Sequence, residues 1–248
     1  MQVLEKKTKG FTILELIVVI AILGILSAAV YPNFSSWIKE RKVRQAAERI
    51  KNLISSINTQ VQRGSYEFVQ VRFVEDGSVT IFTNGIGTNS LAAKKKDPDN
   101  DFNTKNTRCN INNDYWDDLG SDGGSPGGVG LFTSDEIAIN FTSETHAVCF
   151  SKDGSYFSDS GLKSPLIICL RRITIVKCNA TRDEKTKEII PAIDHYKNID
   201  GDWIGDENYI YGVEWTRFGS VAMKKWVVEY ATNDDNEKVV INGKWVQR

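Results

Sequence analysis

The sequence predicts an α+β fold, with one long N-terminal helix packed on an antiparallel β-sheet domain. Two observations predict it. Apolar side chains recur at helical spacing from the N-terminal region to Val61. Beyond that point, short runs of alternating apolar and polar residues are separated by Gly, Asp and Asn. The chain has 248 residues, which suits one domain with an appendage.

The first half of the predicted helix, residues 11–34, is apolar enough for the interior of a membrane. Every residue from Leu16 to Val30 is apolar or small, and the run extends back to Ile13 with one interruption, Glu15. About 20 helical residues cover the hydrocarbon core of about 30 Å. Lysines at positions 6, 7 and 9 predict that the N-terminus stays in the cytoplasm. We therefore expect a single-pass inner-membrane protein with its remaining domain in the periplasm or outside the cell.

Glu15 is the anomaly of this segment, because a carboxylate inside a span costs about 2.5–3.5 kcal/mol on insertion scales. One alternative is a cleaved signal peptide with its site at Ser27-Ala28-Ala29. Another is a plain membrane anchor for an extracytoplasmic protein with no filament role. Neither explains Glu15, and an ionisable residue in a span is functional by default.

The motif around Glu15 resembles a known processing signal. Gly10-Phe11-Thr12-Ile13-Leu14-Glu15-Leu16, after a short basic leader, is similar to the signal of type IV pilins and type II secretion pseudopilins. The resemblance covers about the first 35 residues. It implies that prepilin peptidase removes residues 1–10 by cutting between Gly10 and Phe11, and that Phe11 becomes N-methylphenylalanine. It also implies assembly with other pilin or pseudopilin subunits on an inner-membrane platform, into a pilus or a secretion pseudopilus.

The implied cleavage gives Glu15 a role, because it creates a cationic amine at Phe11, about one helical turn away. The carboxylate of one subunit can pair with the amine of the next, which favours assembly and sets the axial register. Breaking a buried pair of this kind typically costs about 3–5 kcal/mol. The alternative is that Glu15 is protonated or pairs with a lipid headgroup.

Gly24 and Pro32 are the other candidate assembly residues. Pro32 has no N–H for the carbonyl of Ala28, which weakens the helix there. Gly24-x-x-x-Ala28 is a small-residue pattern that lets helices approach closely. The resemblance implies that this stretch partly unwinds in filaments. The alternative is that Pro32 simply marks the membrane exit.

The spacing of apolar residues within 35–64 predicts the amphipathic half of the same helix. Gly64 is expected to end this helix as its C-cap. Its apolar stripe includes Ala46, Ala47, Ile50, Leu53, Ile54, Ile57 and Val61. Its basic residues, Lys39, Arg41, Lys42, Arg44, Arg49 and Lys51, predict a solvated face, with headgroups or nucleic acid as alternative partners.

Alternating runs within residues 65–248 predict a β-rich globular domain. Alternating runs flank the turn at Asp76-Gly77 and predict a hairpin from Val69 to Phe82. Further strands are predicted at Glu136–Phe141, His146–Phe150, Pro165–Lys177, Tyr209–Phe218, Lys225–Ala231 and Lys238–Val246. The passage Ile50–Gly77, together with Phe150-Ser151-Lys152-Asp153-Gly154, resembles the GspH/FimT branch of minor pilins and pseudopilins. The chain is longer than that branch usually is, and residues 92–130 look like a polar loop insertion.

Four cysteines, Cys109, Cys149, Cys169 and Cys178, are disulfide candidates in an oxidising exterior. Cys169 and Cys178 would lie about 30 Å apart on one continuous strand, so we expect Cys109 or Cys149 to pair with the later two. The Cys169–Cys178 pairing is the alternative if the strand breaks at Arg171-Arg172. No metal or other cofactor is predicted. Asp97-x-Asp99-x-Asp101 begins like an EF-hand loop, but Phe102 and Arg108 stand where glycine and glutamate are needed. Another calcium arrangement in the acidic loops stays open.

The sequence lacks G-x-S-x-G, P-loop and H-E-x-x-H motifs, and we predict a structural subunit rather than an enzyme. The alternative function is a minor pilin whose exposed domain binds DNA for uptake. Its candidate contacts are Arg171, Arg172, Lys177, Arg182, Lys185 and Lys187, with Lys224 and Lys225 as a smaller patch. The formal charge of −1, which leader removal lowers to −3, does not favour it.

Overall fold

The computed structural model describes residues 11–89, 92, 96, 109, 130–140, 145–153, 156–158, 166–171, 178, 180–182, 189–191, 209–216, 220–232 and 238–247. They form one helix, α1 (Ile13–Gln62), and antiparallel strands, so the α+β prediction is confirmed. The chain divides into two compact units, Met1–Lys39 and Glu40–Arg248. The helix is continuous in the backbone through Pro32.

The C-terminal end of α1 has the geometry that the sequence predicts. Gly64 has a φ of +79°, and its N–H bonds to the carbonyl of Val61 at 2.9 Å. The N–H of Ser65 bonds to the carbonyl of Gln60, also at 2.9 Å. These two bonds define a Schellman motif, in which a left-handed glycine closes the last turn. The predicted C-cap at Gly64 is confirmed.

The first sheet has the strand order β3-β2-β1-β5-β6. Its strands are β1 (Phe68–Asp76), β2 (Ser78–Ile86), β3 (Gly130–Ser134), β5 (Thr145–Ser151) and β6 (Tyr156–Ser158). Asp76 pairs with Ser78 across Gly77, whose φ of +64° favours glycine in this tight turn. The predicted hairpin is therefore present, and its inward-facing side chains Val69, Val71 and Phe73 are buried.

The second sheet has the strand order β12-β11-β10-β7-β4. Its strands are β4 (Ile137–Ile139), β7 (Leu166–Leu170), β10 (Tyr211–Trp215), β11 (Val221–Thr232) and β12 (Lys238–Gln247), and a separate hairpin joins β8 (Ala180–Arg182) to β9 (Ile189–Pro191). Strands β3, β6, β8 and β9 were not expected from the sequence. Strands of three to five residues often show too little alternation to be recognised.

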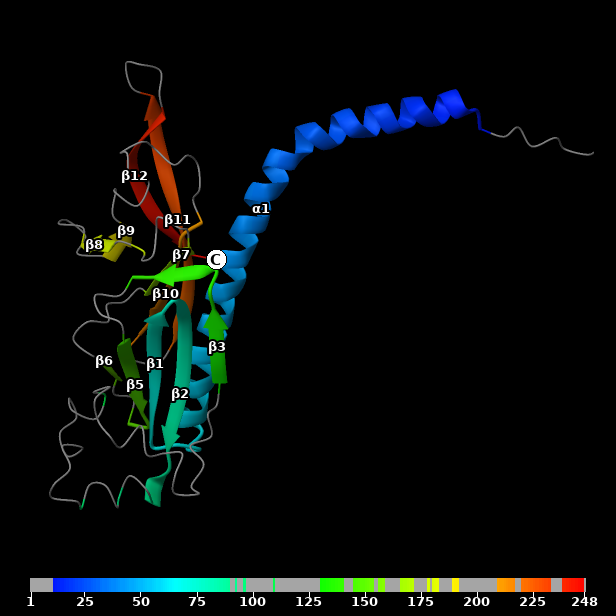
Figure 1. The fold of residues 1–248 in the computed structure, drawn as a ribbon. Coiled ribbons are helices and arrows are strands. Elements are labelled where there is room, and N and C mark those ends of the chain that lie inside the picture. The colour runs from blue at the N-terminus through cyan, green and yellow to red at the C-terminus, as the bar shows by residue number, and fades with distance from the viewer. Residues whose placement is uncertain are drawn as a thin grey trace, which may run out of the picture. The chain divides into compact units, whose positions relative to one another are not determined.

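The core of the globular unit lies between the second half of α1 and the two sheets (Figure 1). Ile50, Ile54 and Ile57 of α1 are buried there, at the spacing that the sequence predicts. The sheets contribute facing side chains, including the stacked rings of Phe73 and Trp215, whose centroids are 6.5 Å apart. A second apolar cluster, on β4, β7, β9, β10 and β11, includes the cysteines of the second disulfide.

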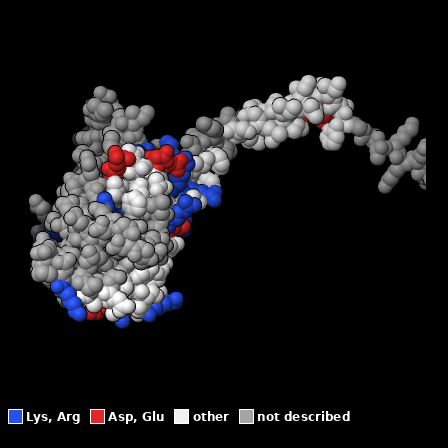
Figure 2. Space-filling view, turned by 60° about the horizontal axis from the view of Figure 1, so that its bottom comes forward, with Lys and Arg blue, Asp and Glu red and all other residues white. Residues whose placement is uncertain are grey.

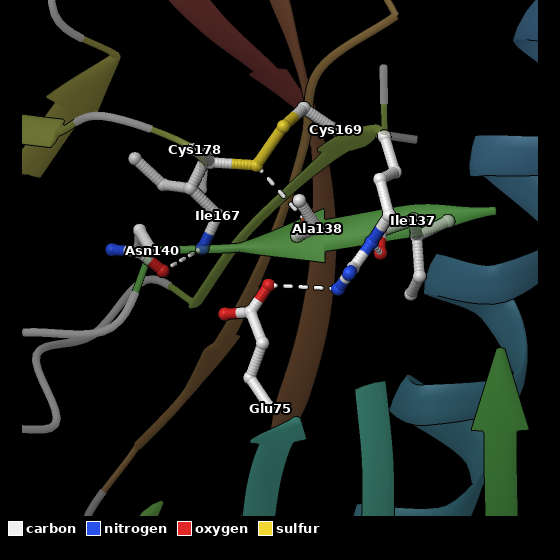
Figure 3. Close-up of a disulfide and its surroundings, with 8 residues drawn as sticks. Glu75, Ile137, Ala138, Asn140, Ile167, Cys169 and Cys178 are labelled. Atoms are coloured by element: carbon white, nitrogen blue, oxygen red, sulfur yellow. Dashed lines mark hydrogen bonds and ion pairs between the residues drawn. A yellow bond between two sulfur atoms is a disulfide. The ribbon is translucent and has the colours of Figure 1, made fainter. Parts of the chain in front are cut away.

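The disulfide pairing differs from the one expected. Cys109 pairs with Cys149 and Cys169 with Cys178, at Cα separations of 5.8 and 6.0 Å. The expectation of crosslinks between the early and late cysteines is wrong, because β7 ends at Leu170 and the chain does not continue as one straight strand to Cys178. Figure 3 shows the Cys169–Cys178 bond beside Ala138 of the neighbouring strand β4.

Candidate assembly site

The first turn of α1 positions Glu15. The carbonyl of Thr12 accepts the first helical hydrogen bond, from the N–H of Leu16 at 3.2 Å, which makes Thr12 the N-cap. The Thr12 hydroxyl accepts from the N–H of Glu15 at 3.2 Å, and the Glu15 carboxylate accepts in return from the N–H of Thr12 at 3.4 Å. This reciprocal pair is a capping box.

The capping box changes the expected energetics of Glu15. Its carboxylate is already bound to one backbone donor, and it lies at the helix N-terminus, where the macrodipole favours negative charge. Thr12-Ile13-Leu14-Glu15 has the T-x-x-E spacing that indicates a capping box, although this interaction was not among those expected from the sequence. An ionised carboxylate has about four acceptor positions, so the bond to Thr12 leaves capacity for a cationic partner.

The segment after Glu15 is an exposed apolar helix. The sequence has no charged residue between Glu15 and Lys39, and Phe11 at the helix start is 85% exposed. The other exposed apolar side chains are Ile13, Leu14, Leu16, Ile17, Val18, Val19, Ile20, Ile22, Leu23, Ile25 and Leu26. The hydroxyl of Ser27 donates to the carbonyl of Leu23 at 2.7 Å, so this polar group is satisfied within the helix.

Two of the predicted assembly residues have a limited structural description. A Cβ placed on Gly24 would have no neighbour within 4 Å, which leaves a smooth helix surface at that position. Gly10 lies outside the described residues, as does the side chain of Pro32. Among the residues that are described, no helix meets both the length and the hydropathy requirements for a membrane span.

In the globular unit, α1 is held to the sheets by charge as well as by its apolar stripe. Glu40 accepts a hydrogen bond from the hydroxyl of Tyr211 at 3.0 Å and forms an ion pair with Lys225. Lys42 forms an ion pair with Glu136, which follows β3. The contacts of Glu40 lie at the start of the buried stripe and fasten the helix to β10 and β11, whereas the more exposed Lys42–Glu136 pair lies beside the β3–β4 turn.

Two basic residues on the helix face predicted to be solvated have acidic partners. Arg44 lies 2.9 Å from Glu48, one turn along, and this neighbouring carboxylate raises the pKa of the Arg44 guanidinium. Lys42 is paired with Glu136, as described above. Exposed pairs of this kind contribute little stability. Figure 2 shows basic and acidic groups side by side on the visible described surface.

Arg171, a candidate of the alternative DNA-binding surface, is engaged inside the globular unit. Arg171 donates to Glu75 at 3.0 Å and to the backbone carbonyls of Gly77 and Ile137 at 2.8 and 3.0 Å. Its side chain is only 15% exposed, and that of Glu75 only 3%. Figure 3 shows Glu75 below the strand that holds Ile137. Arg171 therefore acts as an internal link between β1, the β1–β2 turn and β4.

Lys224 and Lys225, the smaller patch considered for DNA binding, also have acidic partners. Lys224 lies 2.7 Å from Glu214, and Lys225 pairs with Glu40. Arg182 is exposed at the end of β8. Four other candidates, Arg172, Lys177, Lys185 and Lys187, lie outside the described residues.

The acidic residues for which a calcium arrangement stays open, Asp97, Asp99 and Asp101, also lie outside the described part. Among the described residues, no group of three or more His, Cys, Asp or Glu side chains is arranged to hold a metal ion.

Two comparisons with known proteins found a similarity over part of the chain. Residues 6–31 match the family described as the prokaryotic N-terminal methylation motif. A fimbrial protein from Moraxella nonliquefaciens is 43% identical over 56 residues, which are 23% of this chain and 36% of that protein. The match therefore spans about a third of the relative's length. No solved structure matches the chain.

The geometry defines a class: a chain with an exposed apolar N-terminal helix, capped by Thr12 and Glu15, and a β-rich domain on the second half of the same helix. The methylation motif and the fimbrial relative make the chain similar to type IV pilins over the matched residues. The likeness to the GspH/FimT branch is not confirmed by either comparison.

Proposed function

We propose that the chain is a minor pilin or pseudopilin, a structural subunit of a type IV pilus or a type II secretion pseudopilus. Prepilin peptidase removes residues 1–10 between Gly10 and Phe11 and methylates the Phe11 amine. The mature subunit stays in the inner membrane through residues 11–34, with its globular domain outside the cytoplasm. The observation that supports this proposal most strongly is the capped Glu15, the lone charge in an apolar helix matched by the methylation motif.

Assembly follows from the chemistry of the first turn. Cleavage leaves a primary amine at Phe11, and its methylation gives a cationic secondary amine directly before Thr12 and four residues before Glu15. Within one subunit, Glu15 is held by Thr12, and this bond orients the carboxylate before any neighbour arrives. An incoming subunit places its Phe11 amine against the remaining acceptor positions of Glu15. Charge-assisted hydrogen bonds of this kind are about twice as strong as neutral ones.

The pair also fixes the axial position of each subunit, because only one register brings amine and carboxylate into contact. The exposed apolar side chains of α1 then exchange lipid for neighbouring helices. Gly24 permits close approach, since it presents no side chain to a neighbour. Pro32 gives the helix a point of local unwinding, because it cannot donate to the carbonyl four residues earlier.

The three other segments have distinct roles in this proposal. Residues 35–64 join the filament core to the outer domain, and the apolar stripe and the contacts of Glu40 hold this half of α1 on the sheets. Residues 65–248 form the filament surface, and residues 92–130 form a polar loop insertion within it. The ion pairs of Arg171, Lys224 and Lys225 do not favour DNA binding by these residues.

The test is the Glu15→Leu variant, expressed in cells that lack the native subunit. We expect normal membrane insertion and normal leader removal, but at most one tenth of the wild-type incorporation into filaments. The matched control is Glu48→Leu, which changes an exposed glutamate on the other half of α1 and should leave incorporation unchanged. Wild-type incorporation of Glu15→Leu would contradict the proposal.

A second variant separates capping from pairing. Thr12→Val removes the hydroxyl that caps the helix but keeps the Glu15 carboxylate. Loss of an N-cap side chain costs about 0.5–2 kcal/mol. We therefore expect reduced incorporation, intermediate between wild type and Glu15→Leu.

A further inference from the structure

Two aromatic rings lie together on α1 directly after the apolar run. The centroids of Phe34 and Trp37 are 5.7 Å apart, with 28° between the ring planes. Phe34 is 53% exposed and Trp37 51%, and the neighbouring Ile38 is also exposed. Clustered exposed apolar groups of this size mark contact sites, whereas single exposed apolar residues do not.

The position of the rings along the helix suggests what covers them. Phe34 lies 23 residues after Phe11, which corresponds to about 35 Å of helix, and Trp37 lies at about 39 Å. The hydrocarbon core is about 30 Å thick, or about 40–45 Å with both headgroup layers. If Phe11 lies at the cytoplasmic boundary, both rings reach the headgroup layer on the opposite side. Helical side chains lean toward the N-terminus, which directs these rings back to the acyl boundary.

The chemistry of the neighbouring residues fits the same environment. Trp has an apolar ring and an N–H donor, which explains why it is enriched at membrane interfaces. Arg41, one turn beyond Trp37, is exposed and lies outside the buried stripe that begins at Val43. Cationic side chains near the membrane surface are attracted by anionic lipid headgroups.

We propose that Phe34 and Trp37 form an interfacial anchor, which binds the periplasmic headgroup layer of the inner membrane and sets the depth of the unassembled subunit. This inference rests on the proposed membrane insertion of residues 11–34. The anchor places the start of the globular unit just outside the membrane.

The test uses the full chain in vesicles of phosphatidylcholine and phosphatidylglycerol, at a low protein-to-lipid ratio. Tryptophan fluorescence is quenched by lipids that carry a nitroxide either near the headgroup or near the acyl-chain end. The difference between wild type and Trp37→Phe isolates the signal of Trp37. We expect this component to be quenched at least twofold more by the shallow nitroxide than by the deep one. Trp245→Phe, in the globular unit, is the control and should leave lipid quenching unchanged.

Three results would overturn the anchor. One is a Trp37 component that neither nitroxide quenches, and another is stronger quenching by the deep nitroxide. The third is quenching that disappears as protein density rises at constant lipid, which would assign the rings to a contact with a second copy. Resistance to alkaline extraction is measured in parallel. An extractable chain would contradict the proposed membrane insertion itself, whereas an inserted chain without shallow quenching contradicts the anchor alone.

Discussion

The buried ion pair between Arg171 and Glu75 gives a prediction that separates structure from DNA binding. We consider Arg171→Met, which keeps much of the side-chain volume but removes the guanidinium. It leaves the Glu75 carboxylate, which is 3% exposed, without this cation. It also removes the donors to the carbonyls of Gly77 and Ile137, which accept at 2.8 and 3.0 Å.

The expected magnitude follows from these contacts. Removal of one partner from a buried pair typically costs about 3–5 kcal/mol, because an uncompensated charge stays in a low-dielectric site. The double variant Glu75→Leu/Arg171→Met should be markedly more stable than the sum of the two single variants predicts, since neither charge is left alone. As a control, Arg49→Met changes an exposed arginine on α1 and should stay within about 0.5 kcal/mol of wild type.

The assay is urea unfolding of the full chain in mild detergent, followed by far-ultraviolet circular dichroism and evaluated by linear extrapolation. A DNA titration at several salt concentrations accompanies it, because phosphate contacts make affinity fall steeply with salt. If Arg171→Met has wild-type stability but loses salt-dependent DNA binding, Arg171 is a DNA contact and the structural interpretation is refuted.

Three further predictions concern the termini, packing and redox state of the chain. Mass spectrometry of filament-derived protein should find a mature chain that starts at N-methylated Phe11, and a start at any other residue would contradict the processing. Gly85→Ala should destabilise by about 1–3 kcal/mol, because its Cβ would lie 2.5 Å from the ring of Tyr66, and Tyr66→Ala should remove that penalty. Cys169→Ser should destabilise the chain by about 2–5 kcal/mol in urea unfolding, and an unchanged unfolding midpoint would contradict a structural role for this disulfide.

The helix and the hairpin could be predicted from the sequence because their signals are local. The stripe through Ile50 and Ile54, the glycine at Gly64 and the Asp-Gly turn at Gly77 each depend on residues a few positions apart. The capping box at Thr12 depends on an equally local pattern, the T-x-x-E spacing of Thr12 and Glu15.

The remaining features depend on pairs that are distant in the sequence. Glu75 and Arg171 are 96 residues apart, and no pattern in the sequence indicates that they meet. The pairing of Cys169 with Cys178 depends on the end of β7 at Leu170, where Arg171 and Arg172 interrupt two apolar runs that resemble one long strand. The sequence alone therefore places Arg171 among candidate surface contacts for DNA, whereas in the structure it links β1, the β1–β2 turn and β4.

The contact between the Glu15 carboxylate of one subunit and the Phe11 amine of its neighbour is tested most directly in assembled filaments. Filaments are grown from two pools of subunits, one labelled with ¹³C at glutamate carboxylates and the other with ¹⁵N at phenylalanine. The ammonium nitrogen of Phe11 is distinguished from amide nitrogens by its chemical shift, and dipolar coupling is measured by solid-state NMR. We predict coupling between this nitrogen and a Glu carboxylate of the other pool. With Glu15→Leu, we predict either that no filaments form or that the filaments that form lack this coupling. A separate sample of subunits that carry both labels, diluted in unlabelled subunits, is the control. Coupling in that sample but not in the mixed filaments would contradict the account.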